Sequence, residues 1–533
     1  MKTKTIMKRI LSSMAFVSCS LLIQAQTVYD AVNVADKDIN GTARFVGMGG
    51  AMSALGGDIS TMSTNPAGIG IYRNNDIAFT MGYNVNSTSQ NFAGTQSSAN
   101  KYRFTLDNAG VVIAAKIGER TPLRYANFGF SYRKSKNFYK NTSMAGNGKF
   151  VLGGLSQSFL MASLSDGLKG DDWDKGNHYT NNNIGWLSAL GYDAYITDFD
   201  NSGYYTSKAG TNAYMREFRS VERGSMDEYN FNVAFNTNDR FYFGLTLSAH
   251  DVNYRKYSYY DEDWNNSAEG YVLESYNSLD GQGIDAKFGM IVRPFEEAPL
   301  KLGFAVHTPT FYNLTYTTGA AITSDVFDLP TDTETTSHTV DTYEELGNRD
   351  MERSFHLRTP WLFNVSMGLT VGRQFALDAE YEYKDYKSMK FFDEDGYAAP
   401  FGTENSEVKN CLKHVNAFRV GAEFKPMSQF AIRAGYNYQS AIYNSQTAVK
   451  YLPLNSINTD TDFLNTHHLN TLTLGTGYRS GNVYVDLAYK YDLQKGDFYP
   501  FYNENTADVI EVPEAVRITN NRHKVMMTVG FRF

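Results

Sequence analysis

The sequence predicts an all-β fold, a transmembrane antiparallel β-barrel of the outer-membrane type with about 14 strands and an N-terminal hatch plugging its interior. The chain ends in an alternating stretch, with apolar Val525, Met527, Val529, Phe531 and Phe533 separated mostly by polar or small residues. A lipid-facing barrel strand requires this pattern, although a soluble sandwich strand would also show it. The same alternation recurs along the chain, and short connections alternate with long ones.

The first 25 residues are expected to form a signal peptide. Four basic residues open the chain: Lys2, Lys4, Lys8 and Arg9. The apolar run 10–23 follows, and it is too short to span a bilayer comfortably. Cys19 would fit a lipoprotein signal poorly because the apolar run continues past it. We therefore expect cleavage after Ala25.

Charge and cysteine content exclude several classes of protein. The whole chain carries a net charge of −8, and removal of the signal peptide would make the remainder more acidic. This balance argues against a nucleic-acid partner. Cys411 would be the sole remaining cysteine, so no intramolecular disulfide is expected. Mean hydropathy is −0.41, which fits strands with one polar face.

Alternation places the strands in order along the chain. The expected strands are 77–89, 101–117, 124–138, 227–237, 240–260, 267–293, 299–318, 350–371, 374–387, 411–425, 429–443, 467–479, 482–496 and 521–533. Fourteen strands result from this count, and twelve and sixteen are the alternatives. An even number of strands would place both chain ends on the periplasmic side, and the longest external loop would be 139–226.

The second face of several strands is charged. Asp378, Glu380 and Glu382, for example, alternate with Leu377 and Tyr381. Unpaired charge is costly in a dry core, so these residues predict a polar barrel interior.

The segment 26–76 does not alternate and is rich in small residues, which predicts a compact plug inside the barrel 77–533. Its candidate motif residues are Gly47, Gly49, Gly50, Asp58, Asn65, Pro66, Ala67 and Gly68. A nucleotide-binding loop is disfavoured because the third glycine spacing and a P-loop lysine are missing.

These residues resemble the hatch of the FadL/TodX family of outer-membrane transporters for hydrophobic compounds. The resemblance rests on Arg44, Gly47–Ala51, Asp58 and Asn65–Gly68, followed by a barrel that ends in Phe533. It implies a barrel of fourteen strands and a ligand that leaves sideways through a gap beside an inward kink of the third strand. That strand would be 124–138, where the sequence shows no proline to mark a kink.

The resemblance also implies a function, the passive uptake of small hydrophobic ligands such as fatty acids or aromatic compounds. The expected partners are this ligand, outer-membrane lipids and the barrel-assembly machinery, which would recognise Phe531 and Phe533. We expect a monomer in the outer membrane of a Gram-negative-type bacterium, with no enzymatic activity. The alternatives are a barrel component or shuttle of a secretion system and, third, a barrel enzyme.

Two apolar stretches in the loop 139–226 could form short amphipathic helices. They predict a ligand-landing site at Phe159, Leu160, Leu164, Trp186, Leu187 and Leu190. The alternative is that these residues only pack together as a cap. No metal or cofactor is expected, although four histidines are candidates for haem or, more simply, ordinary surface residues: His178, His356, His467 and His468.

Pro309 and Pro360 interrupt two neighbouring predicted strands at about the same height. Proline cannot donate a ladder hydrogen bond and is restricted to edges, ends or bulges. We therefore predict that regular pairing ends at both prolines, and that 310–318 and 350–359 form a hairpin above the membrane. The alternative is two unrelated bulges.

Overall fold

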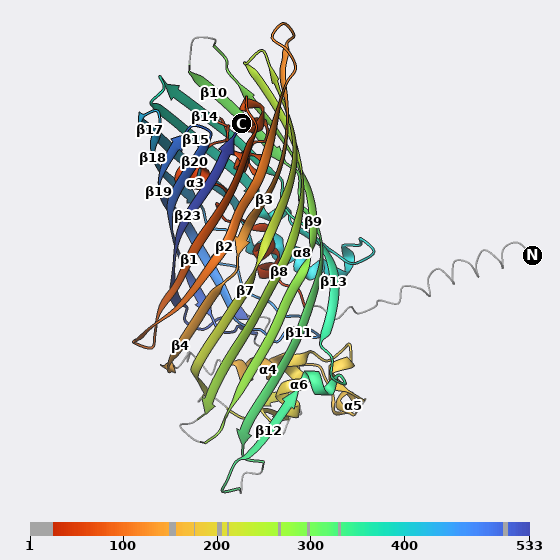
Figure 1. Cartoon of the computed structure of the whole chain (residues 1–533). Helices are drawn as coiled ribbons and strands as arrows, with labels where there is room; N and C mark the ends of the chain where they lie inside the picture. Colours follow the sequence, from red (N-terminus) through yellow and green to blue (C-terminus); the bar gives the residue numbers. More distant parts are fainter. Residues whose placement is uncertain are drawn as a thin grey trace, which may run out of the picture.

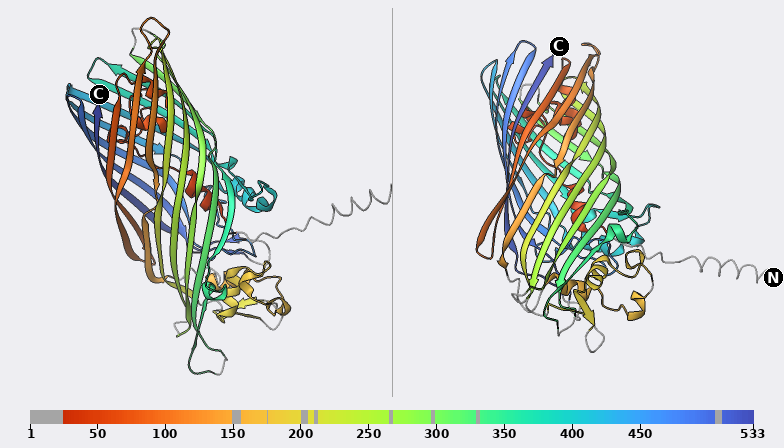
Figure 2. Two further views of the ribbon diagram at one scale, coloured as in Figure 1. Left: turned by 45° about the vertical axis from the view of Figure 1, so that its right-hand side comes forward. Right: turned by 60° about the horizontal axis from the view of Figure 1, so that its bottom comes forward.

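The computed structural model describes residues 25–148, 156–174, 176–199, 205–209, 213–264, 268–295, 299–328, 332–504 and 510–533. These residues form a closed antiparallel barrel of 14 strands, which confirms the predicted fold class (Figures 1 and 2). Residues 1–24 of the predicted signal peptide lie outside the described residues. No described helix is long and apolar enough to cross a membrane.

All the predicted strands are present, three of them in two pieces. The barrel strands are β1 (Asp76–Phe92), β2 (Thr95–Lys116), β3 (Leu123–Asn137) with β4 (Lys140–Gly148), β7 (Ala213–Thr237), β8 (Phe241–Trp264), β9 (Gly270–Val292), β10 (Leu300–His307) with β11 (Phe311–Val326), β13 (Met351–Arg358) with β14 (Leu362–Val371), β15 (Phe375–Asp385), β17 (His414–Met427), β18 (Phe430–Gln439), β19 (Phe463–Ser480), β20 (Val483–Tyr499) and β23 (Val516–Arg532). Pairing of β1 with β23 closes the barrel.

The terminal strand presents the predicted apolar face outward. Val525, Met527 and Val529 are each more than 40% exposed, whereas Met526 and Thr528 are buried. This alternation matches a wall with apolar side chains outside and a filled interior.

The external ends of several strands are longer than predicted. Strand β7 begins at Ala213 rather than 227, and β4 occupies part of the predicted loop 139–226. The outer part of β7 carries Arg216, Glu217 and Arg219. A strand that extends beyond the lipid needs no apolar face, so the alternation that marks the other strands is missing here.

The described residues between β4 and β7 form a helical cap at the external end. The cap contains α4 (Gln157–Ser163), α5 (Gly170–Trp173), η3 (His178–Thr180), α6 (Trp186–Asp193) and the small hairpin β5 (Thr197–Phe199)–β6 (Tyr205–Ser207). Other short elements beyond the barrel wall are β12 (Thr336–Asp341), α7 (Thr342–Glu345), η4 (Tyr386–Ser388), β16 (Lys390–Phe392), η5 (Ala399–Phe401), α8 (Gly402–Cys411), β21 (Asn503–Glu504) and β22 (Ile510–Glu511).

The ladder is interrupted at both prolines, as predicted. Pro309 separates β10 from β11, and Pro360 separates β13 from β14. Beyond the break, β11 pairs with β13 on one side and with β9 on the other. The outer hairpin therefore continues the barrel sheet, and its height relative to the membrane stays a prediction.

Candidate functional site in the barrel lumen

The N-terminal segment lies inside the barrel, where its short helices are visible between the strands (Figure 2). It contains α2 (Val28–Ala35), α3 (Ala43–Gly47), η1 (Ile59–Ser63) and η2 (Pro66–Ile71). Asp58 and Asn65 cap η1 and η2, because their side chains accept hydrogen bonds from the Ser60 and Ala67 amides. Two of the predicted motif residues therefore set the local fold of this segment.

The glycine turn packs directly on glycines of the wall. A Cβ atom added to Gly435 of β18 would lie 2.2 Å from the Gly49 amide nitrogen, and one added to Gly47 would lie 3.2 Å from the Gly475 Cα. Gly49 also has φ +66°, a conformation that favours glycine. The wall glycines were not predicted as site residues. A glycine within a strand often marks such a close backbone approach, and this signal could have found them.

The Asn65–Pro66 turn packs on a second set of wall glycines. Asn65 Nδ2 donates to the Ser53 and Met290 carbonyl oxygens at 2.9 and 3.3 Å. Cβ atoms added to Gly244 and Gly289 would lie 2.3 and 2.8 Å from Pro66 atoms. The motif residues thus connect the segment both to itself and to strands on the opposite side from Gly435.

Two wall carboxylates hold the backbone between these contacts. Glu380 Oε1 accepts hydrogen bonds from the Met52 and Ser53 amides at 2.7 and 2.6 Å. Asp378 Oδ2 accepts from the Ala54 and Leu55 amides at 3.1 and 2.8 Å. The charged inner face of β15, predicted from alternation, therefore binds the N-terminal segment in addition to making the lumen polar.

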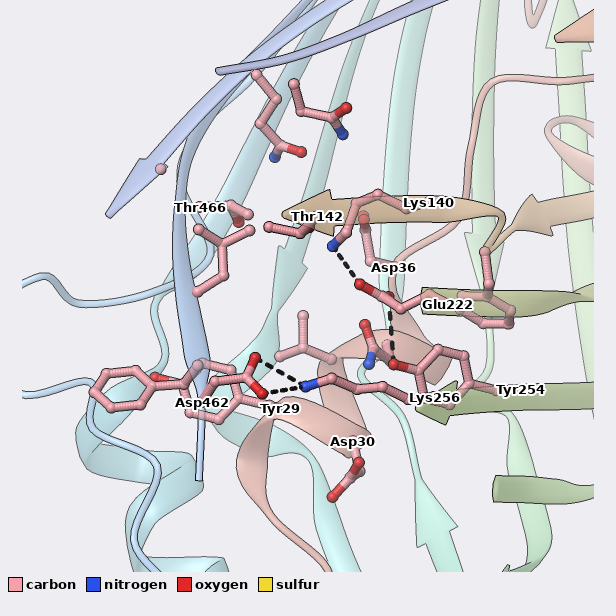
Figure 3. Close-up of a pocket in the computed structure, with 18 of the residues that line it drawn as sticks. Tyr29, Asp30, Asp36, Lys140, Thr142, Glu222, Tyr254, Lys256, Asp462 and Thr466 are labelled. Atoms are coloured by element: carbon pink, nitrogen blue, oxygen red, sulfur yellow. Dashed lines mark hydrogen bonds and ion pairs between the residues drawn. The ribbon is translucent and has the colours of Figure 1, made fainter. Parts of the chain in front are cut away.

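A cavity of about 200 Å³ lies on the external side of this segment, beside α2. Ionisable residues of both signs line it, and most are paired with one another (Figure 3). The pairs are Lys140–Glu222 at 2.6 Å, Arg522–Asp38 at 2.8 Å, Lys136–Asp36 at 3.7 Å and Lys256–Asp462 at 2.8 Å. Aromatic rings, including Tyr29 and Phe463, complete the lining.

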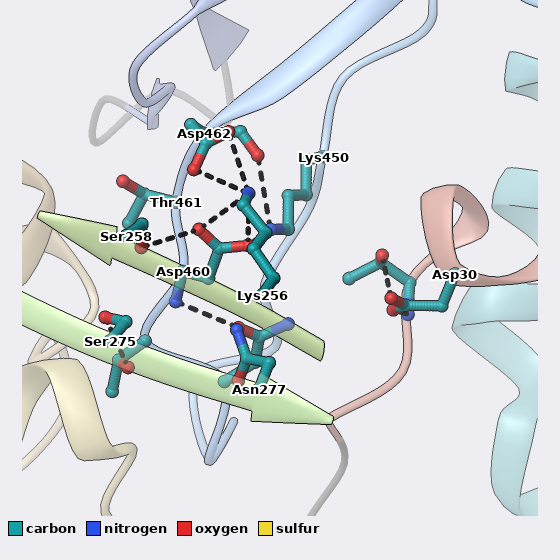
Figure 4. Close-up of polar contacts among 12 residues, drawn as sticks. Asp30, Lys256, Ser258, Ser275, Asn277, Lys450, Asp460, Thr461 and Asp462 are labelled. Carbon is teal, nitrogen blue, oxygen red and sulfur yellow. Dashed lines mark hydrogen bonds and ion pairs between the residues drawn. The ribbon is translucent and has the colours of Figure 1, made fainter. Parts of the chain in front are cut away.

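Two lysines and two aspartates form a network at the outer edge of this cavity (Figure 4). Lys256 Nζ bonds to Asp460 and Asp462, and Lys450 Nζ lies 2.9 Å from Asp460. Burial and the neighbouring Asp460 carboxylate raise the pKa of Asp462, which precedes β19. The network fastens the external segment before β19 to β8 across the barrel mouth.

One wall of the cavity offers unpaired hydrogen-bonding atoms. Among the described residues, Asn86 Oδ1, Thr88 Oγ1 and Asn520 Oδ1 have no hydrogen-bond partner. They lie on the paired strands β1 and β23, and all three residues line the cavity. Buried polar atoms normally have partners, so this wall suits a ligand that carries polar groups.

The third strand leaves its neighbour in the external half of the wall. The β2–β3 ladder ends at Asn108 and Arg133, and β3 shifts register against β7 between Lys134 and Lys136. Within the described chain, 95–107 of β2 has no ladder on this side, because β4 pairs with β7. We call this gap, between 95–107 and 134–148, the β2–β4 seam.

Few interactions cross the β2–β4 seam. Asn141 Nδ2 donates to the Asn100 carbonyl oxygen at 3.3 Å, and Ser97 Oγ donates to the Ser143 carbonyl oxygen at 3.0 Å. The seam lies in the strand where the resemblance placed a kink. The irregularity arises without proline, which is why the sequence of 124–138 did not show it.

No family model and no curated protein matches the sequence. Among solved structures, a Pseudomonas aeruginosa FadL homologue aligns with 93% of this chain and 99% of its own, with a TM-score of 0.51 at 13% identity. The chain has the FadL fold. The P. putida toluene transporter TodX and the Ralstonia pickettii toluene transporter TbuX also align with 93% of this chain, at TM-scores of 0.47 and 0.45 and identities of 11% and 14%.

The predicted landing residues lie in the cap that this FadL-fold barrel carries. Phe159 is 37% exposed, whereas the other five are buried: Leu160, Leu164, Trp186, Leu187 and Leu190. Their burial favours the alternative that these residues pack together as a cap. The cap rests on the barrel mouth, since Trp186 N donates to the Ser456 carbonyl oxygen at 2.9 Å. Landing on Phe159 stays a prediction.

The candidate haem histidines of the FadL-fold chain each have a separate partner. His178 Nδ1 and His467 Nε2 lie 2.9 Å from Asp193 and Asp497, and His356 Nε2 lies 3.1 Å from the Glu394 carbonyl oxygen. His468 packs beside Tyr438. In the described part of the chain, no group of three or more metal-binding side chains is arranged around a common point.

Proposed function

We propose that the chain is an outer-membrane channel for the passive uptake of a small, partly hydrophobic ligand. The observation that carries this proposal is a lumenal cavity next to a gap in the barrel wall that begins near the external membrane interface. The segment 26–76 would serve as the hatch that blocks direct passage along the lumen. FadL-type neighbours include toluene transporters, which supports a ligand with an apolar part.

The lining of the cavity supports an amphipathic compound as the ligand. Its paired charges and unpaired amide and hydroxyl oxygens suit a polar end, whereas the seam leads to lipid and suits an apolar end. The cap over the mouth favours a small ligand over the peptide client of a secretion shuttle. No catalytic step is proposed.

A cross-link across the seam tests the lateral route. Cysteines at Asn100 and Asn141 would join β2 to β4, where these residues are already in contact. We expect cells that carry the oxidised variant to lose uptake of labelled dodecanoate, and reductant to restore it. Cysteines at Ser87 and Asn521, partners in the intact β1–β23 ladder, provide the control. Equal uptake by both oxidised variants would contradict a lateral route.

A further inference from the structure

Three cationic side chains surround one aromatic ring at the β2–β4 seam. Arg103 Cζ lies 4.4 Å from the Tyr139 ring centroid, Arg223 Cζ 5.8 Å and Lys101 Nζ 5.9 Å. Lys101 and Arg103 belong to β2, Arg223 to β7, and Tyr139 to the connection between β3 and β4. We call these four residues the Tyr139 cluster.

The Tyr139 cluster holds more positive charge than its surroundings neutralise. None of its three cations forms an ion pair with a described residue, and the adjacent Glu222 carboxylate is already paired with Lys140 at 2.6 Å. Arg223 Nη1 donates to neutral oxygens, Asn141 Oδ1 at 2.9 Å and the Glu222 carbonyl at 2.8 Å.

Cations deeper in the lumen are matched by acids. Arg522 pairs with Asp38 at 2.8 Å, and Lys524 with Asp107 at 2.6 Å. Like charges that converge without an acid repel one another, and an anion placed among them would relieve this repulsion. The contrast with the paired lumen indicates that the cluster is suited to an external anion.

The cluster lies where the apolar surface of the barrel ends. Tyr102, between Lys101 and Arg103, is 56% exposed, and Tyr83 on the neighbouring strand is 47% exposed. Tyrosines concentrate at membrane–water interfaces. Counting about 9–11 residues per crossing from the end of β2 at Lys116 also brings the chain to the external interface just below Arg103.

The space beside the cluster shares lining residues with the lumenal cavity. A small cavity of about 30 Å³ is lined by Lys101, Arg103 and Tyr139 on the seam side and, toward the lumen, by residues that include Asp38 and Asp492, which are paired with Arg522 and Lys490. Asn86 and Asn137 line both this cavity and the 200 Å³ cavity. A molecule in the seam would therefore have polar contacts toward the lumen and an apolar surface, including Phe104, toward lipid.

We propose that the Tyr139 cluster binds the anionic head group of an amphiphile lodged in the β2–β4 seam. The group is a carboxylate or phosphate, because guanidinium groups donate paired hydrogen bonds to these oxyanions and an ammonium adds a point charge. The apolar chain lies along the outer face of β2. The part of the proposal that concerns a transported ligand rests on the proposed function. The part that concerns binding of an anionic head group rests on the Tyr139 cluster alone.

Binding to the purified full-length protein in neutral detergent tests the site. The probes are dodecyl phosphate and uncharged dodecanol, and the variant is Lys101→Gln/Arg103→Gln. The control Lys116→Gln/Arg120→Gln removes equal charge at the opposite end of the wall. We expect the cluster variant to raise the Kd for dodecyl phosphate about tenfold or more while leaving dodecanol binding unchanged. Equal Kd values for dodecyl phosphate in both variants would overturn the proposal.

Two further measurements identify the source of the head group. If it belongs to the transported ligand, the cluster variant takes up less dodecanoate than wild type and equal dodecanol. If it belongs to a membrane lipid, native mass spectrometry shows phosphatidylglycerol retained by wild type and lost from the variant, with uptake unchanged. Both results support the site. If wild type takes up neither probe, the proposed function fails, and the Kd comparison still decides the site.

Discussion

The Asn65 side chain bonds the N-terminal segment both to itself and to the wall: Nδ2 donates to the Ser53 and Met290 carbonyl oxygens, and Oδ1 accepts from the Ala67 amide. Replacement of Asn65 by Ala would leave the Ser53 carbonyl without this donor and remove the cap of η2. We expect a loss of about 1–3 kcal/mol in the local stability of the segment. Hydrogen exchange of the amides of 52–57 measures it, with exposed Asn183→Ala as the control. Unchanged protection would show that glycine packing alone holds the segment.

Gly435 tests the packing contribution separately. An alanine there would place its Cβ 2.2 Å from the Gly49 nitrogen, so the turn must move away from the wall. Overpacking of this kind costs about 1–3 kcal/mol. A cysteine introduced into the N-terminal segment should be labelled faster in the Gly435→Ala variant than in the protein with Gly435. Gly402→Ala is the matched control, because no atom lies within 4 Å of a Cβ at that position. Equal labelling in the two variants would contradict the close approach.

At the scale of elements, the two prolines divide neighbouring strands into inner and outer parts. If the outer hairpin of β11 and β13 stands above the membrane, water reaches its backbone. Amides of 310–318 and 350–359 should then exchange much faster than those of 300–308 and 361–371. Equal protection on both sides of Pro309 and Pro360 would place the whole hairpin within the lipid.

The external cap contains a histidine whose charge stabilises it. The hydrogen bond that His178 donates to the Asp193 carboxylate raises the pKa of His178, although partial burial opposes this. Because the folded-state pKa is raised above the ordinary value, this stabilisation is full at acidic pH and is lost as pH rises through the folded pKa. Protease should therefore cleave the cap more slowly at about pH 6 than at about pH 9.

The control separates the His178 contribution from other ionisations. His178→Gln should remove this part of the pH dependence, whereas His356→Gln on β13 should keep it. If the His178→Gln variant keeps the full pH dependence of cleavage, that dependence arises from other ionisable groups of the cap.

For the whole molecule, Phe533 is predicted to act in the assembly of the barrel. Phe533 exchanges two backbone hydrogen bonds with Asn75, at 3.0 and 3.1 Å, and its ring stacks on Phe531. Deletion of Phe533 should lower the amount of heat-modifiable, membrane-embedded protein. Phe533→Tyr keeps the backbone bonds and an aromatic ring and should assemble normally. Normal levels of the deletion variant would show that the terminal residue is dispensable.

The sequence predicts the number and order of the strands because a lipid-facing wall requires alternation in each strand independently. It predicts Asn65 through the local turn signal of Asn65–Pro66, whereas Asp58 is predicted only as part of the motif that resembles the FadL/TodX family. It does not reveal the β2–β4 seam, since Lys101, Arg103 and Tyr139 become neighbours only when β4 leaves β2 for β7. The carboxylate contacts of Asp378 and Glu380 also join distant segments. Alternation therefore predicts features that lie within one strand, and it does not predict contacts between segments that are distant in the sequence.

The two ends of the N-terminal segment lie at opposite ends of the barrel. The Ala25 carbonyl oxygen accepts a hydrogen bond from Asn458 near the external mouth, whereas Asn75 pairs with Phe533 at the end of the short turns. If the barrel inserts from the side of the short turns, the residues around Ala25 must reach the external mouth, while the later turns on that side do not cross the membrane. We therefore expect this segment to lie within the forming wall before β1 pairs with β23. Enclosure of the N-terminal segment and closure of the barrel by pairing of β1 with β23 would then be a single step of assembly.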